Sequence, residues 1–212
     1  MDLPFFLLLI AACFVLSLKV MFKRPLNILL PLFFSVLFIV EAICYWYKIN
    51  DRNNMHIYNC WFPVEVAMYT YWVASSLQQQ RWKKVIGAAI IFYLLFVTGL
   101  YIKGQDISQF SSFAYQCGIL LLLPVLLFKL YECMNESAEV YPLQNPVVWL
   151  IIGLLISYLG SFIQFSLQKF LYDYYKDILH ILRIVNIGVT YALYSCIIVY
   201  FVLTWQKKNS YT

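Results

Sequence analysis

The sequence predicts an all-α integral membrane protein, a bundle of about seven transmembrane helices. Of its 212 residues, 63% are hydrophobic and 12% are charged, and the mean hydropathy is +0.76. Soluble domains contain about 25% charged residues, and a soluble fold of this size could not bury so much apolar surface. The apolar runs are nearly continuous, as in residues 28–40 and 119–127, whereas the strands of a membrane barrel alternate apolar and polar residues. We therefore expect helices in lipid.

Seven apolar segments follow one another along the chain. Each is about 20 residues long, which is the length that an α-helix needs to cross a bilayer. The links are short, and the two longest, residues 48–56 and 132–145, are polar and contain turn residues. We expect one transmembrane domain over residues 1–212, with spans at about residues 3–20, 26–47, 57–77, 83–102, 108–131, 146–169 and 178–204.

The first apolar segment is expected to be a retained helix. Only Asp2 is charged before its apolar run, and Lys19, Lys23 and Arg24 follow it. A signal peptide has the opposite order, with basic residues first. The first span therefore counts as part of the bundle.

The sixth segment carries a face of small residues. Gly153, Ser157 and Ser161 recur at every fourth position, with Gly160 beside them. Small residues at this spacing let two membrane helices approach closely. The pattern favours packing against another helix of the same chain over dimerisation.

Basic residues are distributed unequally between the two sides of the predicted bundle. The side with more Lys and Arg is normally cytoplasmic, which places the N-terminus outside and the C-terminus in the cytoplasm, in the cell inner (plasma) membrane. The net charge of +5 is then explained by basic residues at helix ends, which set the orientation of the protein and anchor it to lipid headgroups. No direct nucleic acid binding is therefore expected. The richer side has Lys19, Lys23, Arg24, Arg81, Lys83, Lys84, Lys129, Lys207 and Lys208, and the other has Lys48, Arg52, Lys103, Lys169 and Lys176.

Polar residues inside the spans are predicted to share one depth. An ionisable group deep in a span costs about 2.5–3.5 kcal/mol on insertion scales, so such groups are expected to be paired or to line a wet cavity. With a rise of 1.5 Å per residue, they lie within roughly 12 Å of one membrane face, whichever way the protein is oriented. The candidate ligand-binding residues or polar network are Glu41, Glu65, Gln116, Gln164, His180, Arg183 and Asn186.

Three interpretations of this polar layer remain open. The first is a salt-bridge and hydrogen-bond network that fixes helix register, and the second is a pocket for a ligand or ion. The third and least favoured is an active site. Glu41 and Glu65 outnumber the single guanidinium of Arg183. The spare acid must be protonated, paired with His180 or hydrated, which favours a pocket over a purely structural network.

Several kinds of membrane enzyme and pigment lack their required residues here. A retinal protein needs a lysine inside the last span, and a zinc amidase of the ceramidase type needs three histidines, whereas the sequence has only His56 and His180. No serine lies in a motif of the rhomboid type. The six cysteines form no CxxC pair, and a Cys44–Cys60 disulfide stays open as an alternative. We expect no enzyme, no catalytic residues, no metal site and no cofactor.

Two segments resemble a known group of proteins. They are residues 59–65 (NCWFPVE) and 177–187 (DILHILRIVNI). These segments resemble small, poorly characterised seven-helix membrane proteins of Bacteroidetes-type bacteria, which are similar to the membrane halves of seven-transmembrane sensor kinases. The resemblance implies a sensory role and makes Glu65, His180 and Asn186 the matching positions. A sensor kinase continues into a cytoplasmic kinase, and this sequence does not, so a signal would pass to a separate partner.

The function expected from the sequence is a receptor-like or sensory membrane module with a polar pocket in the outer half of the bundle. One alternative is a transporter, a channel or a pore-forming accessory protein of a bacterial defence system. Another is a structural subunit of a membrane complex. The partners compatible with these interpretations are the lipid bilayer, a small ligand or ion, a membrane or cytoplasmic protein, and further copies of the chain.

Overall fold

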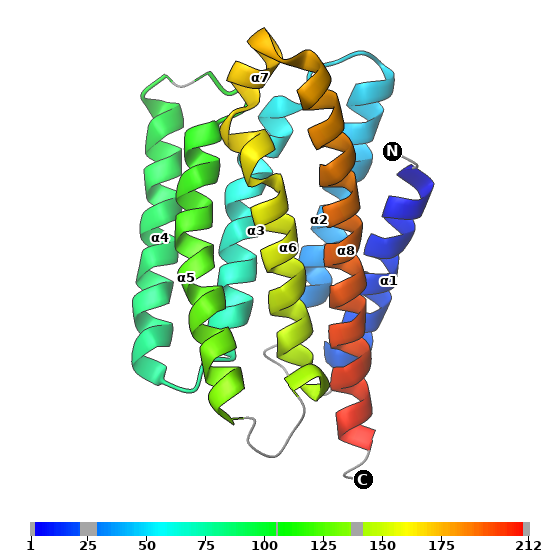
Figure 1. Ribbon diagram of the computed structural model, residues 1–212, viewed down its shortest axis with the longest axis vertical. Coiled ribbons are helices and arrows are strands. Elements are labelled where there is room, and N and C mark those ends of the chain that lie inside the picture. Colours follow the sequence, from blue (N-terminus) through cyan, green and yellow to red (C-terminus); the bar gives the residue numbers. More distant parts are fainter. Residues whose placement is uncertain (1–2, 22–28, 105, 137–141, 210–212) are drawn as a thin grey trace.

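The computed structural model of the protein describes residues 3–21, 29–104, 106–136 and 142–209. Of the described residues, 89% are helical. Figure 1 shows long helices side by side, with the short helix α7 across one end of the bundle, which we call the α7 end. The elements are α1 (Leu3–Met21), α2 (Leu29–Ile49), α3 (Met55–Ser75), α4 (Gln80–Ile102), α5 (Ser112–Glu136), the 3₁₀ turn η2 (Pro142–Gln144), α6 (Pro146–Ser166), α7 (Gln168–Tyr174) and α8 (Lys176–Asn209).

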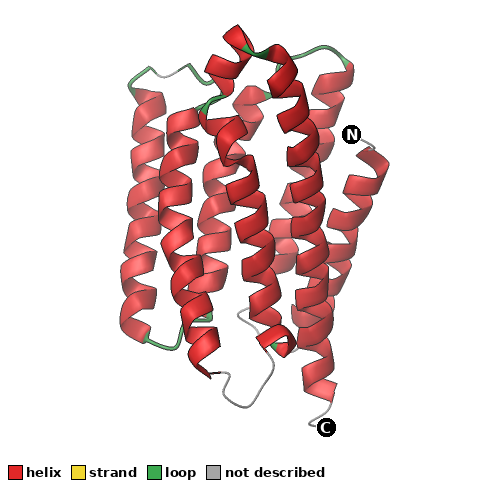
Figure 2. Cartoon of the chain, in the orientation of Figure 1, coloured by secondary structure: helices red, strands yellow, loops and turns green. Residues whose placement is uncertain are grey.

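Among the described residues, five helices are long and apolar enough to cross a membrane, namely α2, α4, α5, α6 and α8. An all-α, multi-pass membrane bundle is therefore confirmed. The first and third predicted spans, which correspond to α1 and α3, are less clearly long and apolar enough to cross a membrane. The apolar part of α1 is shorter, and α3 has a lower hydropathy because it carries polar residues such as Asn59 and Glu65. Figure 2 shows that short loops join the helices.

The helix boundaries differ from the predicted spans by a few residues, and two of the differences concern the fifth and sixth spans. The fifth span was expected from residue 108, but α5 begins at Ser112, because residues 106–111 form a loop held by side chains of neighbouring segments. The sixth span was expected to reach residue 169, but α6 ends at Ser166 and the chain turns into α7, which the sequence pattern did not predict. The first three residues of the second predicted span, 26–28, lie outside the described residues, as do Lys23 and Arg24.

An aromatic cluster fills the interior of the bundle in its middle and toward the opposite end. We call it the aromatic floor, and it consists of Phe33 and Phe34 from α2, Tyr69 and Trp72 from α3, and Phe201 from α8. All five side chains are buried. The ring centroids lie 5.3 Å apart for Phe33 and Tyr69 and 5.8 Å apart for Trp72 and Phe201. Buried leucine and isoleucine residues of α5, α6 and α8 complete this part of the core.

The small-residue face of α6 packs against α8. A Cβ atom added at Gly153 would lie 2.7 Å from the Cβ atom of Cys196, and one added at Gly160 would lie 2.8 Å from a methyl group of Val189. Both neighbours belong to α8. Packing within the chain is therefore confirmed for this face, and it fixes the rotation of α6 relative to α8.

A buried ion pair closes the end opposite α7. The Lys129 ammonium group lies 3.1 Å from a carboxylate oxygen of Glu132, one turn further along α5. The same carboxylate accepts a hydrogen bond from the backbone N–H of Gln78, between α3 and α4. This contact joins α5 to the neighbouring turn.

All six cysteines lie among the described residues, and all six are free thiols. Cys44 is buried and Cys60 is exposed. The disulfide that the sequence left open between them is therefore not formed in this structure.

Candidate functional site

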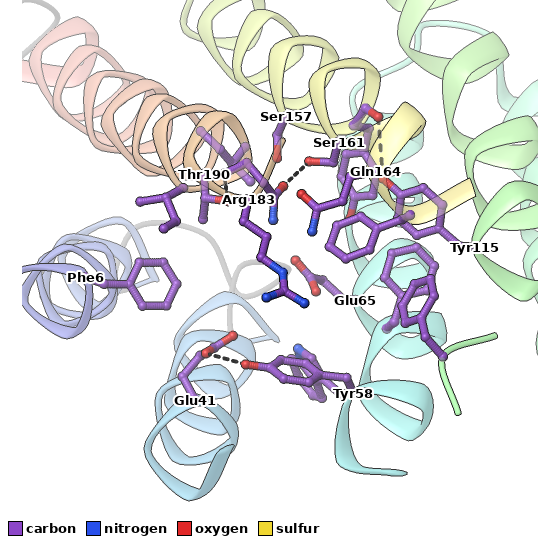
Figure 3. A pocket seen from close by; sticks show the side chains of 18 of the residues that line it. Phe6, Glu41, Tyr58, Glu65, Tyr115, Ser157, Ser161, Gln164, Arg183 and Thr190 are labelled. Carbon is purple, nitrogen blue, oxygen red and sulfur yellow. Dashed lines mark hydrogen bonds between the residues drawn. The ribbon is translucent and has the colours of Figure 1, made fainter. Parts of the chain in front are cut away.

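A cavity of about 470 Å³ lies in the half of the bundle nearer the α7 end. This volume falls within the range of about 300–1,000 Å³ that is usual for small-molecule sites. Its walls come mainly from α2, α3, α6 and α8, with Phe6 of α1 and Tyr115 of α5 filling the gaps between them. Figure 3 shows the polar side chains of these helices converging on the same space.

Five of the seven predicted site residues line this cavity. Glu41 comes from α2, Glu65 from α3, Gln164 from α6, and Arg183 and Asn186 from α8. The helices alternate in direction, so residues that lie far apart in the sequence reach the same depth from the same end of the bundle.

The other two predicted site residues lie outside the cavity lining. Gln116 follows Tyr115, and successive residues point about 100° apart around a helix of 3.6 residues per turn, so only Tyr115 takes the inward position. His180 is exposed and lies one turn nearer the end of α8 than Arg183, beyond the lining. Pairing of the spare acid with His180, one of the three alternatives that the sequence left open, therefore has no counterpart in this geometry.

On the α2–α3 side, a hydrogen bond holds one carboxylate in place. The Tyr58 hydroxyl donates to a carboxylate oxygen of Glu41 at 3.2 Å. Lys48 lines the cavity about two turns further along α2, at the exposed end of the helix. The mouth of the cavity therefore carries an ammonium group above a carboxylate.

On the α6–α8 side, the polar groups bond to one another. The Ser161 hydroxyl donates a short hydrogen bond to the side-chain oxygen of Asn186. The Thr190 hydroxyl donates to the backbone carbonyl oxygen of Asn186 at 2.7 Å. These bonds fix the wall of the cavity that the close approach of α6 and α8 creates.

In contrast, Arg183 and Glu65 lack a charged partner within the part of the chain that the structure describes. Arg183 is exposed at the rim, and its guanidinium group extends into the cavity between Glu41 and Glu65 (Figure 3). Among the described residues, the ion pair Lys129–Glu132 is the only one with an N–O distance of 4.0 Å or less. Among the described residues, neither Arg183 nor Glu65 makes a side-chain hydrogen bond. The salt-bridge network that the sequence allowed is thus not formed here.

Two neutral polar atoms at the cavity are also unsatisfied. The side-chain oxygen Oε1 of Gln164 and the indole nitrogen Nε1 of Trp61 are buried without a hydrogen-bond partner. Both side chains line the cavity, and they are only 6% and 9% exposed. Buried polar groups in native proteins nearly always have a partner, so an acceptor and a donor remain available to a ligand.

The loop between α4 and α5 covers part of the α7 end. Asn59 of α3 is buried, donates to the carbonyl oxygens of Ile107 and Gln109 at 2.8 and 2.6 Å, and accepts from the N–H of Ser111 at 3.1 Å. The following Phe110 lines the cavity. Asn59 therefore positions an aromatic part of the cover.

The α4–α5 loop is also held by the exposed side chain of Asp106, and Phe165 of α6 completes the aromatic cover of the cavity. The side-chain hydroxyl and the N–H of Ser108 donate to Asp106 at 2.7 and 2.8 Å and lower the pKa of this carboxyl group. Phe165 of α6 packs against Phe110, with ring centroids 5.0 Å apart. The α7 end of the cavity thus has a defined, largely aromatic cover.

Sequence reasoning missed part of the aromatic lining of the cavity. Phe6, Phe110, Tyr115 and Phe165 line the cavity, but aromatic residues in an apolar helix carry no signal that separates a cavity wall from a lipid-facing or core position. Lys48 was not among the seven candidate residues, although it follows Glu41 by seven residues and so shares its helix face.

The arrangement favours binding of a small polar molecule. Groups of both charges and unpaired hydrogen-bonding atoms surround a space of ligand size with aromatic walls. Within the described residues, no three His, Cys, Asp or Glu side chains lie close enough together to hold a metal ion. Comparisons with known proteins found no matching protein family, no matching curated protein and no matching solved structure.

Proposed function

We propose that this protein is a receptor-like membrane module that binds a small polar ligand in the cavity near its α7 end. In this proposal all of the long helices, α1 and α3 included, cross the inner (plasma) membrane, which gives seven spans. The N-terminus lies outside and the C-terminus in the cytoplasm, so the cavity opens outward. The signal passes to a separate protein partner, as the resemblance to sensor-kinase membrane halves predicts.

One observation carries the proposal. Arg183 extends into a cavity that also contains Glu41 and Glu65, yet it pairs with neither of them in the described structure. An unpaired charge inside a membrane protein is costly, and a network that served only to hold helices together would be expected to close such pairs. A ligand that carries charge of its own would satisfy these groups.

The middle and opposite half of the bundle favour binding over transport. The aromatic floor and the aliphatic core beneath it are packed from side to side. A transporter or channel needs a second opening in this region. A receptor needs only a change in helix packing that the ligand can bias.

Thermal unfolding of the purified protein in nanodiscs tests the proposal against a library of small charged and polar molecules. A ligand that binds the folded state raises the melting temperature. We expect at least one compound to do so for the natural protein, and we expect Arg183→Leu to abolish the effect while the variant still folds.

Glu132→Gln is the matched control, because it breaks the ion pair at the opposite end and leaves the cavity intact. It should lower the melting temperature and keep the response to the compound. The opposite pattern, in which no compound acts and Arg183→Leu prevents accumulation of folded protein, would favour the structural-subunit alternative.

A further inference from the structure

The charges around the cavity have both signs. Glu65 of α3 and Arg183 of α8 point toward one another across the cavity, with Glu41 of α2 beside them (Figure 3). With Lys48 at the mouth, the lining has two carboxylates and two basic groups, so their formal charges cancel. Binding sites are electrostatically complementary to their ligands. This lining therefore matches a ligand of zero net charge that carries both signs.

The unsatisfied neutral atoms have the same dual character. Gln164 offers an acceptor, Oε1, and Trp61 offers a donor, Nε1. A carboxylate alone could accept from the indole N–H but could not donate to the amide oxygen. A simple ammonium ion could do only the reverse. A ligand that satisfies both atoms needs a donor and an acceptor.

From these two observations we infer that the ligand is a compact zwitterion with a primary ammonium group. Its anionic group binds Arg183, and its ammonium group binds Glu65 and the side-chain oxygen of Gln164. Two sources present this chemistry, a free α-amino acid and the headgroup of phosphatidylethanolamine. This inference rests on the proposed function, since it identifies the chemical class that the same cavity binds.

The Gln164 oxygen sets the requirement for a primary ammonium group. A primary ammonium group has three N–H donors, whereas a trimethylammonium group has none, although both carry the same charge. Because the Gln164 side chain is only 6% exposed, there is little room for a water molecule to donate to its oxygen in place of the ligand's N–H groups. The site therefore distinguishes an amino acid from its betaine, and phosphatidylethanolamine from phosphatidylcholine.

The experiment has two arms that separate the sources. In the first arm, the protein is placed in phosphatidylcholine nanodiscs, and each of the twenty standard L-amino acids is added while the melting temperature is recorded. In the second arm, nanodiscs with and without phosphatidylethanolamine are compared, and retained lipid is identified by native mass spectrometry. For the best amino acid, its N-trimethyl derivative and its deaminated carboxylic acid are tested alongside it.

We expect one arm to show binding and the trimethylated counterpart to bind at least tenfold more weakly. Gln164→Met should weaken binding of the primary ammonium compound by about ten- to a hundredfold, because it removes one hydrogen bond to a charged group. The same variant should bind the trimethylated compound as the natural protein does. Glu132→Gln should bind every compound as the natural protein does.

Two outcomes would overturn the inference in different ways. If the deaminated acid binds as tightly as the amino acid, the ligand need not be a zwitterion, and if the betaine does, the ligand need not carry a primary ammonium group. Either result overturns the inference, and the proposed function stands if Arg183→Leu still abolishes binding. If neither arm shows binding and no compound of the wider library raises the melting temperature, the zwitterion and the proposed function both fail.

Discussion

At the scale of single residues, Asn59 shows how one side chain can position a loop. Its amide group satisfies two carbonyl oxygens and one N–H of the α4–α5 loop. Each buried backbone group left without a partner costs about 1–3 kcal/mol. Asn59→Ala should therefore lower the melting temperature and increase hydrogen exchange in residues 106–111, measured by mass spectrometry.

The neighbouring Asn53 provides the control for this prediction. It also donates to the loop, to the carbonyl oxygen of Ser108 at 2.8 Å, but its side chain is exposed to solvent. Water can replace that bond, so Asn53→Ala should change stability by much less. Equal effects of the two variants would mean that burial of Asn59 does not determine how the loop is held.

At the scale of helices, the α6–α8 contact depends on the absence of a side chain at Gly153. An added Cβ atom would lie 2.7 Å from Cys196 and 3.3 Å from a backbone oxygen of Leu193, so the two helices must move apart. Overpacking of this kind costs typically about 1–3 kcal/mol. We expect Gly153→Ala to lower the melting temperature and, because Ser161 and Asn186 bridge the same two helices beside the cavity, to weaken ligand binding.

Gly188 serves as the matched position for this substitution. It lies on α8, and an added Cβ atom there would meet nothing within 4 Å. Alanine is favoured over glycine within a helix, so Gly188→Ala should leave stability unchanged or raise it. A loss of stability in Gly188→Ala equal to that in Gly153→Ala would show that helix propensity, and not the close contact, controls the result.

At the scale of the whole molecule, the orientation decides which side of the membrane the cavity faces. Lys103 lies in the loop at the α7 end, and Gln79 lies at the opposite end, and both side chains are exposed. In a Cys60→Ala background, which removes the exposed native thiol, we expect a membrane-impermeant maleimide added to spheroplasts to label Lys103→Cys and not Gln79→Cys.

Inverted membrane vesicles provide the complementary measurement and should give the reverse labelling. If the spheroplasts instead label only Gln79→Cys, the protein has the opposite topology, and the ligand reaches the cavity from the cytoplasm. The charge pattern predicts the first result, because more basic residues lie at the end of the bundle that carries Gln79.

The sequence by itself determined that the protein folds in lipid as a bundle of helices and that its polar residues lie at one depth. Both conclusions follow from local rules: a helix must satisfy its own backbone in lipid, and a fixed rise per residue converts sequence position into depth. These rules located Glu41, Glu65, Gln164, Arg183 and Asn186 well enough to suggest a shared site before any contact was known.

Only the tertiary structure decided which residues meet. The rotation of each helix about its axis depends on side-chain packing, and this rotation points Tyr115 rather than Gln116 into the cavity. Depth estimated from the rise per residue also could not decide which of His180 and Arg183, one turn apart on α8, lines the cavity. The unpaired state of Arg183 and the unsatisfied oxygen of Gln164 depend on distances between helices that no local pattern encodes. The first carries the proposed function, and the second supports the inference about the ligand.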